Sequence, residues 1–328
     1  MSVGFECGAV YRPRFAMAGR PVPSPDEDEF TVAVGAWEAL ALPPGAPRPT
    51  HLHLAGEIPP SLDWAFLAYL GGPADVHHHR GDSAELDEAI AAVSATGEGV
   101  TSLVLAVEPA GTGGAVAVAL RFGPNSERRS PRWTPRPGSV GGAERVAAAL
   151  VEFGAVAATG TAAPREEPPW PLERAHQFST VPPSQVAEGA YVPRARYLEN
   201  LPSRWRLEAD RCGRCGRVTF PRRGRCRYCG PAGQLSPEIL PRDGAIVVAA
   251  TVIGKGGQPT EFDPQVDALG SYGVVLAEFA PGVRLTLQVT DSAPGGVRIG
   301  DRVGTRLRRL YPMEGEWRYG RKAVPISP

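Results

Sequence analysis

Apolar residues in the first half of the chain recur with two spacings, one typical of helices and one typical of strands. Helical spacing, with apolar side chains three and four residues apart, predicts helices at residues 30–42, 61–69, 83–94 and 143–153. Short continuous apolar runs predict buried strands at residues 51–55, 102–107 and 115–122. Acidic residues at 26–29 precede the first helix, where negative charge complements the helix dipole. The alternation predicts an α/β layered domain over residues 1–165.

The last third of the chain is dominated by strand patterns. Strands are predicted at residues 245–253, 272–279, 283–289, 301–311 and 317–326, with glycine-rich turns between several of them. Five short strands in so few residues predict a small closed or nearly closed β-barrel over residues 236–328.

Between these two parts, residues 126–196 are rich in Pro, Arg and Gly, which is typical of a linker. Residues 191–207 then predict a short helix that is interrupted at Pro202. We therefore expect a Pro-rich linker and a docking helix at residues 166–203.

Four of the five cysteines form two Cys-x-x-Cys pairs, each followed by glycine: Cys212 and Cys215, then Cys226 and Cys229. A tight turn at such a pair directs both sulfur atoms toward one ion, and two pairs complete the tetrahedral sulfur set of a structural zinc site. Four thiolates leave no open coordination position, so we expect the zinc to be structural and not catalytic. The alternative is a set of disulfides or free thiols, and no feature upstream indicates an oxidising compartment.

Charge is balanced overall but not along the chain. The whole sequence has 35 basic and 35 acidic residues, while residues 204–328 hold 20 Lys and Arg against 12 Asp and Glu. The C-terminal part is therefore expected to meet an anionic ligand or partner, or the acidic half of its own chain. No window contains eighteen consecutive apolar residues and the N-terminus shows no signal segment, so we expect a cytoplasmic protein without membrane contact.

Residues 191–326 resemble the acyl-CoA-associated zinc-ribbon/OB-fold family, once catalogued as domain of unknown function thirty-five. The resemblance is carried by the cysteine pairs, by Val-Thr-Phe-Pro-Arg at residues 218–222, and by Val-Arg-Ile-Gly-Asp-Arg-Val at residues 297–303. It implies a rubredoxin-like zinc ribbon at residues 204–235 and a five-stranded OB-fold barrel after it. It also implies a non-catalytic accessory subunit that binds acyl-CoA and bridges or activates a partner enzyme of the thiolase superfamily.

The first 165 residues resemble the N-terminal half of archaeal-type 3-hydroxy-3-methylglutaryl-CoA synthase, a thiolase-fold enzyme. The resemblance rests on residues 8–14, on the acidic residues 26–28, and on Thr31 and Ala33. It implies a thiolase-like half-domain that lacks the catalytic nucleophile, because His79 occupies the position of the family's nucleophilic cysteine. Cys7 falls in the opening strand and cannot replace it. Acyl transfer needs a thiolate beside a base, so we expect no catalytic residues in this chain.

A basic run beside the second cysteine pair is the candidate ligand site. Clustered guanidinium groups bind phosphates in a bidentate manner, although a solvated basic surface has the same composition. The CoA contacts expected from the family resemblance are Phe220, Pro221, Arg222, Arg223, Arg225 and Arg227.

Two further readings of the sequence remain open. Zinc ribbons and OB barrels also bind nucleic acid, so a single-stranded nucleic-acid-binding protein is the alternative function. An acyltransferase with an unrecognised nucleophile is a third hypothesis. The run His77 to His79 is interpreted as a loop or remnant more readily than as a metal site, because three consecutive side chains do not converge on one ion. His51 and His53 share a strand face and are expected to be half-buried, and not ligating.

Overall fold

The computed structural model of the chain divides into two compact units, Met1–Glu167 and Pro168–Pro328. The structure describes residues 4–11, 15–17, 20–22, 26–43, 45–56, 58–79, 89–93, 100–110, 114–123, 156–158, 194–231, 233–313 and 316–326. No helix within these ranges is both long enough and apolar enough to cross a membrane. Each unit is described by itself below.

The N-terminal unit is built on a six-stranded mixed sheet with the order β5-β4-β6-β7-β1-β8. In chain order its strands are β1 (Gly4–Tyr11), β4 (His51–Gly56), β5 (Asp75–His79), β6 (Ser102–Ala110), β7 (Gly114–Gly123) and β8 (Val156–Ala158). Strand β4 is parallel to β5 and β6, β8 is parallel to β1, and β7 is antiparallel to its two neighbours. A small hairpin of β2 (Phe15–Met17) and β3 (Arg20–Val22) lies outside this sheet.

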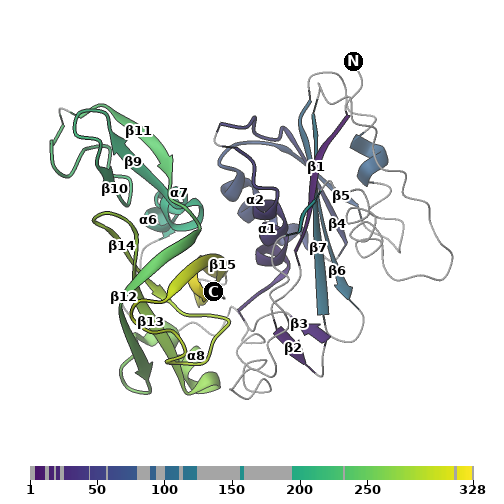
Figure 1. Cartoon of the computed structure of the whole chain (residues 1–328). Coiled ribbons are helices and arrows are strands. Elements are labelled where there is room, and N and C mark those ends of the chain that lie inside the picture. Colours follow the sequence, from purple (N-terminus) through teal and green to yellow (C-terminus); the bar gives the residue numbers. More distant parts are fainter. Residues whose placement is uncertain are drawn as a thin grey trace. The chain divides into compact units, whose positions relative to one another are not determined.

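Two helices, α1 (Glu29–Ala39) and α2 (Asp63–Leu70), cover one face of this sheet (Figure 1). The predicted acidic residues lie at the start of the first helix, where the side chain of Asp28 caps it by accepting a hydrogen bond from the backbone N–H of Thr31. The helices pack through aromatic rings, with Phe30 and Phe66 edge to face at 5.0 Å between centroids. A short 3-10 turn, Pro60–Leu62, leads into α2.

The strands predicted at residues 51–55, 102–107 and 115–122 are confirmed as β4, β6 and β7, and the first two predicted helices as α1 and α2. The interpretation of His77 to His79 as a loop is wrong, because these residues form the end of edge strand β5. Residues 89–93 are helical, as predicted for the segment 83–94, while the rest of that segment is outside the described residues. The helix predicted at 143–153 and most of the Pro-rich stretch also lie outside them.

The C-terminal unit contains a five-stranded antiparallel sheet in the order β14-β13-β12-β15-β16. Its strands are β12 (Asp243–Gly254), β13 (Ser271–Ala280), β14 (Val283–Gln288), β15 (Arg302–Met313) and β16 (Glu316–Pro325), which confirms all five predicted strands. The two outermost strands approach each other where Val289 forms a bridge with Ala323, and the Thr290 N–H donates to the Ala323 carbonyl at 2.9 Å. The sheet is therefore barrel-like.

One helix of the C-terminal unit was not predicted from the sequence. The 3-10 turn Thr260–Phe262 and the helix α8 (Asp263–Leu269) connect β12 to β13. The apolar interior of the barrel includes Val247, Val275 and Leu285.

The predicted helix at residues 191–207 is present as two short helices, α6 (Arg194–Glu199) and α7 (Leu201–Arg206). Two buried aromatic side chains attach them to β16. The Tyr197 hydroxyl donates to the Tyr319 carbonyl at 3.1 Å and accepts from the Tyr319 N–H at 2.8 Å. The Trp205 indole N–H donates to the same carbonyl at 3.0 Å. Burial raises the pKa of Tyr197, so its hydroxyl keeps the proton that these contacts use.

Replacing Tyr197 with Phe is expected to destabilise the C-terminal unit by about 1–3 kcal/mol, because the buried N–H of Tyr319 loses its acceptor. Denaturant unfolding of the full chain, followed by tryptophan fluorescence, measures the change. The exposed Leu198 on the same helix supplies the control, and Leu198→Ala should leave the unfolding midpoint within error. Equal effects of the two variants would contradict the assignment of stability to this contact.

Candidate functional site

The cysteine pairs lie in a small three-stranded antiparallel sheet with the order β10-β9-β11. Its strands are β9 (Glu208–Cys212), β10 (Val218–Thr219) and β11 (Leu235–Ile239). The first pair occupies the turn that joins β9 to β10, and the second lies in the long connection between β10 and β11. This module has few buried apolar side chains of its own. We therefore expect its fold to depend on a metal ion that links the two cysteine turns.

The two cysteine turns have the same backbone geometry. The Gly216 N–H donates to the Cys212 carbonyl at 2.8 Å, and the Gly230 N–H donates to the Cys226 carbonyl at 3.0 Å. Both glycines have positive φ, +69° and +66°, a conformation that residues with a side chain adopt at a cost. The glycine that follows each pair is therefore what allows both sulfur atoms of the pair to face the same side.

All four sulfur atoms lie within 4.8 Å of one another, and the Sγ atoms of Cys215 and Cys226 are 3.7 Å apart. Four sulfurs bound at 2.3 Å around a tetrahedral zinc ion are about 3.8 Å apart, so the donor set fits zinc. Among the described residues, these cysteines are the group whose ligand atoms already converge in this way. Gly233 leaves room for them, since a Cβ there would lie 2.8 Å from Cys212 Sγ.

The electrostatics of the cluster favour a bound cation. The backbone N–H groups of Cys229 and Tyr228 donate to Cys226 Sγ at 3.3 and 3.4 Å, and they lower the pKa of that thiol to about 7. Contact with the other sulfurs, Cys215 first, raises the pKa of Cys229 to about 12. Full ionisation of four adjacent thiols is therefore unfavourable unless a metal ion compensates the charge.

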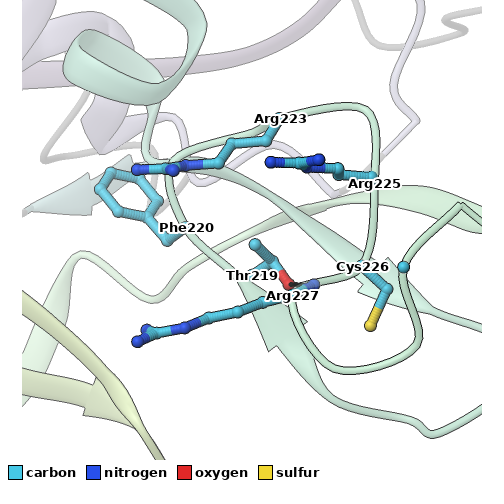
Figure 2. Close-up of a pocket in the computed structure, with 7 residues that line it drawn as sticks. Thr219, Phe220, Arg223, Arg225, Cys226 and Arg227 are labelled. Carbon is cyan, nitrogen blue, oxygen red and sulfur yellow. Dashed lines mark hydrogen bonds between the residues drawn. The ribbon is translucent and has the colours of Figure 1, made fainter.

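A cavity of about 420 Å³ lies beside the second cysteine pair (Figure 2). Its lining includes the backbone and side chains of Thr219, Phe220, Arg223, Arg225, Cys226, Arg227 and Gly230. In Figure 2 the three arginines project from one loop, and the side chains of Arg223 and Arg227 extend in the same direction. All three are exposed, and their guanidinium groups form no ion pair with the residues that the structure describes. The cavity is thus a positively charged pocket with an aromatic ring in its wall.

Two of the six predicted ligand contacts, Pro221 and Arg222, are not among the residues that line this pocket. Arg222 donates from Nε to Asp210 at 2.9 Å and also pairs with Glu208 at 3.0 Å, so it anchors the loop and does not line the pocket. Pro221, which follows a cis peptide bond, is also absent from the lining. Thr219 lines the pocket but was missed, because nothing in its sequence context distinguishes it from other strand residues.

The buried carboxylate of Asp210 fixes the start of the arginine loop. Asp210 is 2% exposed, and its second oxygen accepts a hydrogen bond from the backbone N–H of Arg223 at 3.1 Å. The end of the loop is held at Cys226, where the Arg227 N–H also faces Thr219 Oγ1 at 3.4 Å. The pocket is consequently formed by a loop tied at both ends.

The N-terminal unit contains a second group of chemically active side chains, the five histidines of β4 and β5. His53 is buried, with 1% of its surface exposed, which is more than the half-burial expected from the sequence. Burial, and then the charges of His77, His79 and His51, lower the pKa of His53 to about 4, so its ring is neutral at neutral pH. Cys7 lies in β1, as predicted.

Comparison with known proteins shows what the cysteine module is similar to. Residues 203–234 match the family described as ChsH2, rubredoxin-like zinc ribbon domain. A DUF35 domain-containing scaffold protein of Methanothermobacter thermautotrophicus is 29% identical over 132 residues, which is 40% of this chain and 94% of the relative. A protein of the same description from Methanocaldococcus jannaschii is 29% identical over 134 residues, 40% of this chain and 90% of the relative. The resemblance of the C-terminal part to this family is therefore confirmed.

Similar solved structures include the Ltp2-ChsH2(DUF35) aldolase, with 22% identity, a TM-score of 0.30, and coverage of 42% of this chain and 98% of that chain. PksG, a 3-hydroxy-3-methylglutaryl-CoA synthase from Bacillus subtilis, has 20% identity and a TM-score of 0.31. That match covers 42% of this chain and 48% of the synthase.

Removing one sulfur ligand is expected to unfold the ribbon, because binding at such sites contributes on the order of 10 kcal/mol and is coupled to folding. In Cys229→Ser the remaining ribbon thiols should react rapidly with Ellman's reagent, and backbone amides of residues 208–239 should lose protection from hydrogen exchange. Cys7→Ser, which changes the one cysteine outside the ribbon, is the matched control and should alter neither readout. Ribbon amides that stay protected in Cys229→Ser would refute the metal-dependent fold.

Proposed function

We propose that this chain is a non-catalytic scaffold subunit that binds acyl-CoA and bridges or activates a partner enzyme of the thiolase superfamily. The proposal rests first on the curated relatives, which are described as scaffold proteins and match this chain over nearly their whole length. In this proposal the ribbon carries a structural zinc ion, the barrel is of the OB type, and the complex works in the cytoplasm, where thiols stay reduced.

The observation that carries the proposal is the pocket lined by three exposed arginines that form no ion pair within the described ranges. CoA presents a 3′-phosphate and a diphosphate on either side of an adenosine, so it offers several anionic groups within a few ångströms. Guanidinium groups bind such phosphates through paired N–H donors, and the ring of Phe220 offers an apolar surface for the adenine. A cavity of about 420 Å³ is large enough for the nucleotide end of CoA but not for the whole molecule. The acyl end would therefore extend beyond the pocket toward the partner.

Zinc has a structural role in this proposal. Four thiolates fill the tetrahedron, so no position is left for water or for a thioester oxygen. The ion would offset part of the negative charge of the four thiolates and link the two cysteine turns rigidly. The chemistry on the thioester belongs to the partner, whose reaction would be a condensation, a thiolytic cleavage or an aldol cleavage.

The N-terminal unit would serve as a docking face in the manner of a thiolase half-domain. The position that the family resemblance assigns to the nucleophile holds His79, at the end of β5, and an imidazole cannot form the thioester intermediate of that family. Cys7 lies in β1 and pairs across the sheet with Arg121. Neither residue is proposed to be catalytic.

Removing a pocket arginine is expected to weaken CoA binding about tenfold, since each lost phosphate contact corresponds to roughly 1.4 kcal/mol or more. Calorimetric titration of the full chain with acetyl-CoA would compare Arg225→Gln and Arg227→Gln with the wild type. Arg214→Gln is the control: it removes the same charge from an exposed ribbon position that does not line the pocket. An equal loss in all three variants would show a general charge effect and contradict the pocket assignment.

The alternative function, binding of single-stranded nucleic acid, gives a different result in the same titration. An oligonucleotide would bind at least as tightly as acetyl-CoA, with a steep loss of affinity as salt is raised, because several phosphates would release counterions. Tight binding of this kind without CoA binding would overturn the scaffold proposal in favour of the alternative.

Co-expression with a thiolase-superfamily protein encoded beside this chain is expected to give a complex that co-purifies through size-exclusion chromatography. Cys212→Ser should abolish the complex, because it unfolds the ribbon that forms the bridge. Cys7→Ser should leave the complex intact. A complex that survives the loss of zinc would show that the ribbon is not the bridge.

A further inference from the structure

Strands β4 and β5 place four histidines on one face of the N-terminal sheet. The strands are parallel and in register, with His51 beside Asp75 and His53 beside His77. Successive side chains on a strand point to opposite faces, so His77 and His79 share a face and His78 points away from them. The contact of His78 with Asp63 on α2, at 2.8 Å, places His78 on the helix-covered face. The other histidines of these two strands therefore lie on the opposite face.

The rings of these histidines form a continuous series. The ring centroids of His51 and His77 are 5.7 Å apart, those of His77 and His53 are 4.8 Å apart, and those of His53 and His79 are 5.3 Å apart. His53 Nδ1 lies 3.0 Å from His79 Nε2. Two imidazoles on one tetrahedral metal ion, with metal–nitrogen bonds of 2.0–2.1 Å, have ring centres about 5 Å apart and ligand nitrogens about 3.3 Å apart. The ring-centre distances are close to the first value, and the His53–His79 nitrogen distance is close to the second.

His53 also has a buried atom without a partner. Its Nε2 is inaccessible to solvent and makes no hydrogen bond with the part of the chain that the structure describes. A buried polar nitrogen in this state costs about 1–3 kcal/mol. The nitrogen that faces His79 is Nδ1, so an ion would offset this cost only after the His53 ring turns. A neutral imidazole has one nitrogen with a free lone pair, and that is the form that binds metals.

We propose that His53, His77 and His79 form a binding site for a divalent transition-metal ion, separate from the cysteine cluster. A His-x-His pair on one strand and a third histidine on the adjacent strand converge on one face of a sheet, as three-histidine zinc sites require. Three nitrogen donors select borderline ions such as Zn²⁺ and Co²⁺ over Mg²⁺ and Ca²⁺, which prefer oxygen. The site lies on an edge pair of strands, and His77 is exposed, so an ion can enter from solvent.

Binding requires the rings to turn. As they lie in the structure, the planes of His53 and His77 are 19° apart and those of His53 and His79 are 22° apart, so the rings are stacked and do not point at one centre. The χ2 torsion of histidine is broad, so rotation about it directs the nitrogens inward without moving the strands. The register of β4 and β5 therefore brings the three side chains together, while their rings are not yet oriented for binding.

Titration of the zinc-loaded full chain with Co²⁺ tests the site apart from the ribbon. We expect one further equivalent to bind with visible absorption typical of cobalt but without the near-ultraviolet charge-transfer band of thiolate ligands. His77→Gln and His53→Gln should each weaken this binding by more than about tenfold. His77 is at the sheet edge and exposed, so its variant is expected to fold even if the buried His53 variant does not.

His78→Gln is the matched control, because it removes a histidine from the same strand on the opposite face. It should retain the added equivalent of Co²⁺, and competition with Zn²⁺ should displace that cobalt. The proposal is overturned if no cobalt binds beyond the ribbon, if a thiolate band accompanies the binding, or if His77→Gln and His78→Gln bind cobalt equally.

Discussion

Four thiol groups held within 4.8 Å of one another are the constraint on which the zinc ribbon depends. Four thiolates this close repel one another unless a cation compensates their charge, so we expect the backbone around them to have its fold only together with the metal. The ribbon is too small to bury an apolar core, and its three short strands are held by the cysteine turns and by the glycines that permit them. By contrast, the barrel that follows has an apolar interior and needs no such ion.

The most specific features could be predicted from the sequence because they are local. Cysteine spacing, the glycine after each pair, the acidic cap of α1 and the five barrel strands each follow from a few neighbouring residues. The helix α8 was missed because its seven residues follow a glycine- and proline-rich turn and carry too little periodicity. Strand β5 was misread because three consecutive histidines show no alternation of apolar and polar side chains.

The remaining features depend on contacts between residues distant in sequence. Nothing local distinguishes Arg222 from Arg223. The side chain of Arg222 is an anchor because Asp210 and Glu208, twelve and fourteen residues earlier, pair with it. The histidine series likewise depends on the parallel register of β4 and β5, which brings His53 and His79 together across 26 positions. A pattern within one strand cannot reveal a site that two strands form.

The tie between Asp210 and Arg222 at one end of the arginine loop, and Cys226 at the other, has a physiological consequence. The contact between Asp210 and Arg222 does not depend on a metal ion. The attachment at Cys226 holds only while an ion binds the four sulfur atoms. If the cluster holds zinc as proposed, a cell starved of the metal would leave the loop attached at a single point, and its three positive charges would no longer be held in one place. Binding of the proposed anionic ligand would then follow the metal supply, without any change in the abundance of the protein.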